Sequence, residues 1–314
     1  MAVPALAASL LLTVCRVLMP SPRLLVMVTA LVPFAVIGYV VAALAWWAVR
    51  RLGKGPRGRA TAVVLAVCVG GLALHAAWLV PSYAGSHASG RPDLVVMTSN
   101  LRLGQADTGE VAAVARAQHV DVLVVEEVTE GALASMAGLR ERFPYVAGQP
   151  DVGAFGTVVF SRYPVAAAVR LPVSKGTWEL RVLAPTPFWF VGVHTAQPLN
   201  DASSWRTDHA QLGAAVRRLS GPVVLAGDFN ATLDHRPLRR LLSAGFADAA
   251  RQANSGWQPT WPSASRAAGA LPFGLRLMAL DHVLTDRHYS AISTSTYPIA
   301  RSDHRALVAR LALS

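Results

Sequence analysis

The stretch PVVLAGDFNAT at residues 222–232 decides how the rest of the chain is interpreted. Its first half is apolar and β-branched, which is typical of a strand buried on both faces. The strand breaks at Gly227, and Asp228 and Asn230 follow one residue apart. In an extended segment such a pair projects to one side, with Phe229 turned inward. The pair is either an Asx turn that caps the strand or a carboxylate and an amide placed for catalysis.

Composition divides the 314 residues into two parts. The chain is 53% hydrophobic and only 15% charged, which is more apolar than an ordinary soluble domain. Seven of the 29 basic residues precede residue 85, which leaves 22 basic against 18 acidic side chains, a net charge of +4, after it. The positive charge is therefore no nucleic-acid footprint, because most of the excess belongs to the apolar N-terminal part. Cys15 and Cys68 lack metal-ligand spacing, which argues against structural zinc and thiol catalysis.

The N-terminal part, residues 1–82, contains apolar runs that predict three transmembrane helices, at about 2–20, 24–49 and 60–81. Residues 83–92 are rich in Ser, Gly, His and Pro and are interpreted as a linker. The alternative for the first run is a cleaved or lipidated start, although it has no basic n-region and no clear cleavage site.

The loop at residues 50–59 carries five cations, and the positive-inside rule places it in the cytoplasm. With three spans, the N-terminus is then cytoplasmic and everything after Tyr83 lies outside. We therefore expect a multi-pass protein of the cell membrane, with the lipid bilayer as one partner and an extracytoplasmic domain at residues 93–314.

From residue 93 onward, short β-rich runs end in polar residues, and segments with helical spacing lie between some of them. This pattern predicts packed sheets with helices outside. If the strand ends converge, they form a site of carboxyl, amide and imidazole groups without a thiol, which suits Mg²⁺ or Mn²⁺ and acid–base chemistry at phosphate. The polar strand ends are Asn100, Glu126-Glu127, His194, Asp228 with Asn230, Asp281-His282 and Asp303-His304.

The motifs GDFN at 227–230 and SDH at 302–304, with the other polar strand ends in the same order, resemble the endonuclease/exonuclease/phosphatase superfamily. That superfamily includes pancreatic-type deoxyribonucleases and neutral sphingomyelinases. The resemblance covers residues 93–314. It implies a four-layer α/β sandwich, in which two mainly antiparallel sheets pack together between helices, and the metal-dependent cleavage of a phosphate ester.

The resemblance implies that Glu127 is the main ligand of the Mg²⁺ or Mn²⁺ ion, with Asn100 beside it. Glu126 stands where the family usually has Gln, so it either adds a metal ligand or faces solvent. We favour the solvent-facing position, because neighbours on a strand point to opposite faces. Arg102 replaces a carboxylate that some members carry, which makes a second metal site doubtful.

The resemblance also implies a set of catalytic residues. Asp228 would orient or deprotonate the attacking water, and Asn230 would hold a phosphoryl oxygen. His304, oriented by Asp303, would contact the scissile phosphate together with His194. The full set is His194, Asp228, Asn230, Asp281, Asp303 and His304, in which Asp281 supports the polar cluster.

The expected position of the domain, tethered to the membrane outside the cell, limits the classes of substrate. A membrane-tethered esterase outside the cell meets lipids first, and the segment AAGALPFGLRL at 267–277 is apolar beside the predicted site. This segment either contacts the bilayer or a lipid tail, or folds onto its own sheet. The layout resembles actinobacterial membrane-anchored members associated with teicoplanin resistance, which implies a lipid-linked phosphate or pyrophosphate of the polyprenyl phosphate cycle. The alternatives are an extracellular nuclease, weakened because residues 153–156 lack the glutamate of deoxyribonuclease-like members, and a non-catalytic binding protein.

Overall fold

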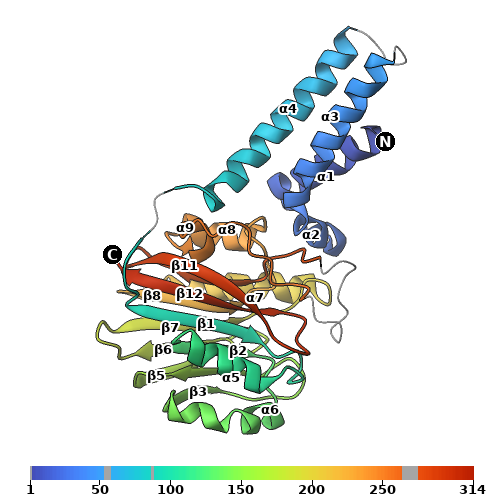
Figure 1. Cartoon of the computed structure of the whole chain (residues 1–314). Helices are drawn as coiled ribbons and strands as arrows, with labels where there is room; N and C mark the ends of the chain where they lie inside the picture. Colours follow the sequence, from blue (N-terminus) through green and yellow to red (C-terminus); the bar gives the residue numbers. More distant parts are fainter. Residues whose placement is uncertain (1, 53–57, 86–87, 264–274) are drawn as a thin grey trace. The chain divides into compact units, whose positions relative to one another are not determined.

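A computed structural model describes residues 2–52, 58–85, 88–263 and 275–314 (Figure 1). The chain forms two compact units. The helical unit comprises Met1–Pro81 with Asp234–Arg236, and the sandwich unit comprises Ser82–Leu233 with Pro237–Ser314.

The helical unit contains apolar helices long enough to cross a membrane. Two helical segments qualify by themselves, Val32–Arg51 with 20 residues and Arg59–Ser82 with 24. A third span is formed only if Ala2–Leu18 and Arg23–Thr29, which are bent by 104° relative to each other, count as one broken span. The main helices are α1 (Ala2–Leu18), α2 (Arg23–Thr29), α3 (Ala35–Arg51) and α4 (Arg59–Leu79).

The run at 24–49, predicted as one helix, is interrupted in the structure. Helix α2 ends at Thr29, and a 3₁₀ turn, η1 (Val32–Phe34), precedes α3. Pro33 lies in this turn, and a proline can neither donate the helical hydrogen bond nor avoid the carbonyl four residues earlier. The prediction of a continuous helix from residue 24 was therefore wrong.

Polar side chains link the helices of this unit. Thr13 on α1 lies 2.8 Å from the hydroxyl of Tyr39 on α3 and 2.9 Å from Nε2 of His75 on α4. Hydrogen bonds between apolar helices are a common means of packing in membranes. His75 is thus part of the helix packing.

The sandwich unit has two six-stranded sheets, in the orders β11-β12-β1-β2-β4-β3 and β5-β6-β7-β8-β10-β9. Each is mainly antiparallel with one parallel pair, β1 with β2 and β7 with β8. The strands are β1 (Leu94–Asn100), β2 (Val122–Glu126), β3 (Tyr145–Gln149), β4 (Thr157–Ser161), β5 (Val165–Arg170), β6 (Trp178–Val182), β7 (Phe188–His194), β8 (Val223–Asp228), β9 (Ala247–Asp248), β10 (Asp281–Thr285), β11 (Tyr289–Pro298) and β12 (Arg305–Leu313).

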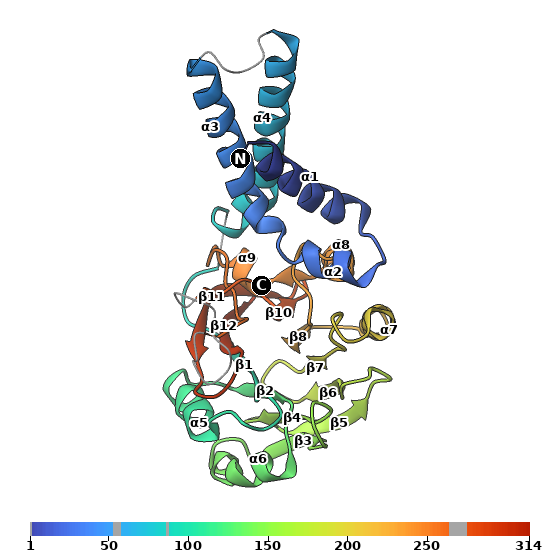
Figure 2. The ribbon, with the colours of Figure 1, turned by 90° about the vertical axis from the view of Figure 1, so that its right-hand side faces the viewer.

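Helices cover the outer faces of the two sheets (Figure 2). The side chains of α5 (Thr108–Ala117) and α6 (Glu130–Ser135) pack with β1 and β2 into one apolar cluster, and a second cluster fills the space between the sheets. Helix α7 (Ala202–Val216) covers the second sheet, and α8 (Arg236–Ser243), α9 (Ala249–Gln252) and the 3₁₀ turn η3 (Ala137–Glu141) are its other helical elements. The 3₁₀ turn η2 (Val80–Ser82) follows α4 where the helical unit ends. The expected four-layer α/β sandwich is confirmed.

The topology brings the polar strand ends together. Strands β1 and β2 run parallel, as do β7 and β8, so each pair ends at the same edge of its sheet. Strands β12 and β10 run antiparallel to β1 and β8, so their beginnings lie at those edges. Because β1 and β2 pack across from β8, the two edges form one end of the sandwich.

Candidate active site

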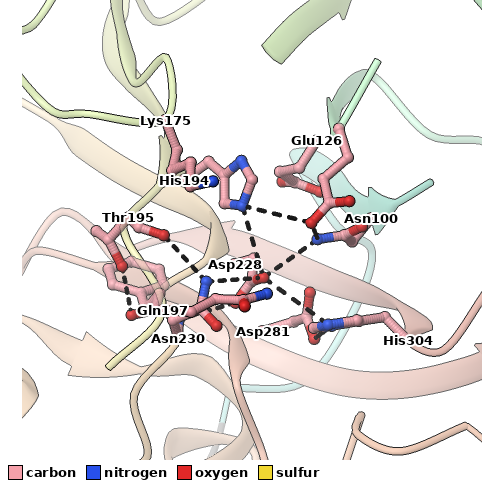
Figure 3. A network of polar contacts seen from close by, with 12 residues as sticks. Asn100, Glu126, Lys175, His194, Thr195, Gln197, Asp228, Asn230, Asp281 and His304 are labelled. Carbon is pink, nitrogen blue, oxygen red and sulfur yellow. Dashed lines mark hydrogen bonds and ion pairs between the residues drawn. The ribbon is translucent and has the colours of Figure 1, made fainter. Parts of the chain in front are cut away.

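Seven of the eight predicted site residues meet at this end of the sandwich, and Figure 3 labels all of them except Glu127. All seven side chains are buried or nearly so: Asn100, Glu127, His194, Asp228, Asn230, Asp281 and His304. The eighth, Asp303, is half-buried at the side of the cluster.

Asp228 is the centre of the hydrogen-bond network. Its Oδ1 accepts from the backbone N of Asn230 at 2.8 Å, and its Oδ2 accepts from the amides of Asn100 and Asn230, both at 3.2 Å. The Oδ1 bond is an Asx turn, so the capping interpretation of the pair is confirmed, whereas its catalytic interpretation stays a prediction. Burial, reinforced by Asp281 and opposed by His304, raises the pKa of Asp228 to about 7. The carboxylate is therefore a stronger base than an ordinary aspartate.

Gly227 allows β8 to approach β7 closely just before Asp228. Its φ is +147°, and a Cβ at this position would lie 1.9 Å from the carbonyl oxygen of Val193. Only glycine fits, because the nearest atom is backbone and cannot move aside. The glycine of the GDFN motif thereby allows the close approach of β7 and β8 at the ends that carry His194 and Asp228.

Asn230 is held in the left-handed region, with φ of +45°. Its amide nitrogen donates to the carbonyl of Thr195 at 3.0 Å and to Asp228. Both N–H groups are thus used within the site, and Asn230 braces Asp228 against the β7–α7 loop. A bond from this amide to a phosphoryl oxygen stays a prediction and requires that one of these two contacts be released.

His304 is oriented by Asp281, not by Asp303 as we predicted. Its Nδ1 lies 2.8 Å from Oδ2 of Asp281, and its Nε2 faces Oδ2 of Asp228 at 3.9 Å. The carboxylate of Asp303 accepts instead from the indole of Trp261 at 3.2 Å. Asp303 precedes β12 by two residues, whereas Asp281 begins the strand that faces the ring.

The charge on His304 follows from the same neighbours. Burial alone would lower its pKa, but the carboxylates of Asp281 and Asp228 raise it well above the usual value. These neighbours therefore favour the imidazolium form of the ring, which can donate a proton or a hydrogen bond.

Glu127 and Asn100 lie side by side at the ends of β2 and β1. The amide of Asn100 donates to Oε1 of Glu127 at 3.3 Å, and Oε2 of Glu127 accepts from the backbone N of Leu103 at 2.7 Å. Glu127 has φ of +57°, a left-handed conformation that costs about 1–3 kcal/mol and is concentrated at functional sites.

Glu126 does not face solvent as we predicted. It is fully buried, and its Oε1 accepts from the hydroxyl of Thr98 at 2.7 Å. Burial, with Asp281 and Asp228 nearby, raises the pKa of Glu126 well above its usual value. The alternation argument failed because both faces of the central strand β2 are covered, and because the left-handed turn at Glu127 brings both glutamates to the same end.

His194 ends β7 opposite Glu127. Its Nε2 lies 4.0 Å from Oε1 of Glu127 and 3.9 Å from Oδ2 of Asp228. Within the described part of the chain, neither ring nitrogen has a hydrogen-bond partner. Burial and the nearby Lys175 lower the pKa of His194 to about 3, so the ring is neutral. Unpaired nitrogens in a buried ring indicate a site that a ligand completes.

The donor set suits a divalent cation. Ligand atoms of Asp228, Asp281 and His304 all lie within 4.8 Å of one another. Two further buried carboxylate atoms, Oε2 of Glu126 and Oδ1 of Asp281, have no partner among the described residues. Several buried carboxylates in one place are costly without a compensating positive charge. The oxygen-rich set favours a hard cation such as Mg²⁺ or Mn²⁺.

His282, beside Asp281 in sequence, has a structural role instead. Its Nδ1 lies 2.9 Å from Asp248, and its Nε2 lies 3.0 Å from the carbonyl oxygens of Ala231 and Ala279. The ring therefore ties β9 to the segment after GDFN.

Sequence motifs gave no indication of Asp208, which braces two loops beside the site. This buried carboxylate on α7 accepts from the backbone N and the hydroxyl of Ser174, at 3.0 and 2.6 Å, and from the backbone N of Ala196 at 2.7 Å. Ser174 precedes Lys175, and Ala196 follows His194 by two residues. Asp208 thus fixes the loops that carry Ser174 and Ala196. These loops are distant from each other in sequence and come close to Asp208 only in the folded structure.

We expect Asp208→Asn to lower kcat/KM by about 10–100-fold, because small displacements of positioned groups are costly. The substituted side chain has only one acceptor oxygen and can no longer accept from the backbone N of both Ser174 and Ala196. Ser174→Ala removes one of the three bonds and is expected to have the smaller effect. Kinetics with a metal-dependent phosphate-ester assay, alongside Tm, measure both. Unchanged kinetics in Asp208→Asn would show that the brace is dispensable.

The sandwich and its site define a class of protein. The family model described as "Endonuclease/Exonuclease/phosphatase family" matches residues 97–304. This chain belongs to that family, whose members hydrolyse phosphate esters. No curated protein sequence matches the chain.

Solved structures share the fold at low sequence identity. Zebrafish (D. rerio) TDP2, complexed with a single-strand DNA product, has 12% identity and a TM-score of 0.60, and covers 69% of this chain and 98% of its own. The 3'-5' exonuclease NExo from Neisseria meningitidis has 17% identity and a TM-score of 0.56, and the match covers 70% of this chain and 100% of NExo. The mannosyl-6-phosphatase Bt3783 from Bacteroides thetaiotaomicron has 14% identity and a TM-score of 0.54, and the match covers 70% of this chain and 100% of Bt3783.

The apolar segment at 267–277, predicted to contact lipid, falls largely outside the described residues, which resume at Leu275. Leu271 and Phe273 belong to that part, so the lipid-contact prediction for this segment stays a prediction.

Proposed function

We propose that this chain is a membrane-anchored, Mg²⁺- or Mn²⁺-dependent phosphoesterase with an extracytoplasmic active site. The observation that carries the proposal is the set of buried carboxylates and histidines with unpaired atoms, gathered at one end of a sandwich of the endonuclease/exonuclease/phosphatase family. The apolar helices and the cationic loop at 50–59 support the anchor and its orientation.

In this proposal Glu127 and Asn100 hold the metal ion, which when bound polarises a phosphoryl oxygen of the substrate. Asp228 orients the attacking water and accepts its proton, since its raised pKa makes it a better base. His304, charged and held by Asp281, donates to an oxygen of the phosphate. The neutral ring of His194 binds another phosphoryl oxygen.

The proposed substrate is a lipid-linked phosphodiester or pyrophosphate. An active site tethered outside the cell by membrane helices is close to such substrates. The resemblance to membrane-anchored proteins associated with teicoplanin resistance points to the polyprenyl phosphate cycle of wall synthesis. A nuclease is the second candidate, because TDP2 is complexed with DNA and NExo is an exonuclease. The net charge of only +4 after residue 84 gives it modest support.

A substrate panel on the purified full-length protein tests this function. The panel contains undecaprenyl pyrophosphate, sphingomyelin, phosphoinositides, and single- and double-stranded DNA, each with Mg²⁺ and with EDTA. We expect the fastest hydrolysis on a lipid-linked substrate and none with EDTA.

Fastest turnover of DNA, with a steep loss of affinity as salt rises, would make the protein a nuclease. Metal-independent binding of one compound without turnover of any would indicate a binding protein on the same fold.

A further inference from the structure

Three large apolar side chains are exposed beside the candidate active site. Leu103 lies on the β1–α5 loop, and Val152 and Phe155 lie on the β3–β4 loop; their exposed fractions are 46%, 78% and 43%. Exposed apolar residues scattered singly are normal on protein surfaces. These three, which we call the apolar rim, differ because their loops are bonded directly to the end of β2.

The first of these loops reaches the proposed metal ligand. The backbone N of Leu103 donates to Oε2 of Glu127 at 2.7 Å. Leu103 has φ of +56° and Arg102 has φ of +48°, so two successive left-handed residues turn the chain back toward the site. The backbone of Leu103 therefore lies directly beside the proposed metal ligand, and its side chain is exposed there.

The second loop is fixed to the residue after Glu127. The backbone N of Val128 donates to the carbonyl of Gly156 at 3.1 Å, and its carbonyl accepts from the backbone N of Asp151 at 2.9 Å. A Cβ at Gly156 would lie 2.0 Å from the carbonyl oxygen of Val128, so the loop packs as closely as glycine permits. Val152 and Phe155 lie between these two bonds and are presented on a fixed backbone.

Lys175 joins the rim to the catalytic residues. Its Nζ lies 4.3 Å from the centroid of the Phe155 ring, a cation–π contact. Its charge also lowers the pKa of His194, and Figure 3 shows the two residues side by side. None of the ion pairs among the described residues involves Lys175, so its charge is available to an anionic ligand.

We infer that the apolar rim and Lys175 bind an amphiphilic phosphate ester, with its hydrocarbon chain along Leu103, Val152 and Phe155 and its phosphate between Lys175 and His194. This inference rests on the proposed phosphoesterase function and identifies the surface that selects the substrate. A cation next to apolar side chains matches the boundary between the head and tail of a lipid phosphate. Nucleic acid fits less well, because two of the three rim residues are aliphatic and cannot stack on bases.

Two substrates that differ only in chain length test the inference, hexadecyl 4-nitrophenyl phosphate and methyl 4-nitrophenyl phosphate. The full-length protein in nanodiscs with Mg²⁺ is compared with Val152→Ser/Phe155→Ser. We expect kcat/KM for the hexadecyl ester to fall about tenfold, as the loss of apolar contact for two side chains implies. The value for the methyl ester should stay within about twofold of wild type.

Leu183→Ser is the matched control. Leu183 has the same exposed fraction as Phe155, 43%, but follows the end of β6 that lies away from the site. It should change neither rate. Val152→Ser alone provides the comparison if the double variant has a lowered Tm, and Lys175→Met should raise KM for both esters.

Equal losses on both esters, or no loss on the hexadecyl ester, would overturn the inference while leaving the phosphoesterase function intact. A selective loss on a single-stranded oligonucleotide would also overturn it, since it would assign the rim to nucleic acid. Failure of the wild-type protein to hydrolyse either ester with Mg²⁺ would contradict the proposed function itself.

Discussion

Asp228→Asn is expected to slow phosphate-ester hydrolysis by about 10²–10⁴-fold, the usual cost of losing a positioned acid–base group. The amide oxygen of the new side chain can still accept from the backbone N of Asn230, so the Asx turn is retained, whereas the new NH2 group loses the bonds from the amides of Asn100 and Asn230. The new side chain can no longer accept a proton from water. Initial rates with saturating Mg²⁺, together with Tm, separate the chemical effect from unfolding.

Asp286→Asn is the matched control for this change. The Oδ1 of Asp286 accepts from the backbone N of His288 at 3.1 Å, the same kind of turn that Asp228 makes with Asn230. Asp286 follows the far end of β10, away from the active site. It should retain wild-type rates. An Asp228→Asn protein that keeps its activity within a few-fold would remove Asp228 from the proton-transfer step.

Glu127→Gln is expected to weaken Mn²⁺ or Mg²⁺ binding by at least about tenfold. Even substitutions of residues that only contact metal ligands lower metal affinity by about 10–100-fold. The remaining carbonyl oxygen can still accept from Leu103, so the loop should stay in place. Titration calorimetry of the metal-free full-length protein measures the affinity without relying on turnover. Chelation with EDTA should abolish activity, and added Mg²⁺ or Mn²⁺ should restore it.

Glu130→Gln, at an exposed position three residues away, should leave metal affinity unchanged. The structure also offers a competing ligand group in Asp228, Asp281 and His304. If Glu127→Gln bound metal normally while Asp281→Asn did not, the ion would belong to that group and the proposed division between metal ligands and catalytic residues would be wrong.

Much of the fold could be predicted from the sequence because several buried strands have a polar residue at one end, as β1, β2, β7, β8 and β10 do. The apolar runs predicted the central strands, and the order of the motifs predicted the sandwich. The apolar N-terminal helices were also indicated, although Pro33 interrupts the second run. A hydropathy pattern gives the length and polarity of an apolar run, whereas a break in the helix depends on where the backbone loses its hydrogen bonds.

The sequence predicted which residues meet at the candidate site better than it predicted which of them are bonded to one another. Alternation failed at Glu126, because left-handed backbone at Glu127 is a property of the folded turn. The motif SDH suggested that Asp303 orients His304, whereas the partner comes from Asp281 on another strand. Such pairings depend on strand register across the sheets, which no local pattern reveals.

Asp208 and Lys175 could not be recognised from the sequence. Asp208 is an ordinary polar residue of an amphipathic helix until the fold places Ser174 and Ala196 against it. Lys175 lies in a loop whose position is fixed by contacts with α7 and with the β3–β4 loop. Long-range contacts of this kind become visible only in the structure.

The most direct test of the central claim is hydrolysis of bis(4-nitrophenyl) phosphate by the purified full-length protein, measured with Mg²⁺, with EDTA, and in the Asp228→Asn variant. The account predicts turnover with Mg²⁺ that is lost with EDTA and falls by about 10²–10⁴-fold in the variant. Turnover that persists in EDTA, or that is unaffected by Asp228→Asn, would contradict a metal-dependent phosphoesterase built on this site.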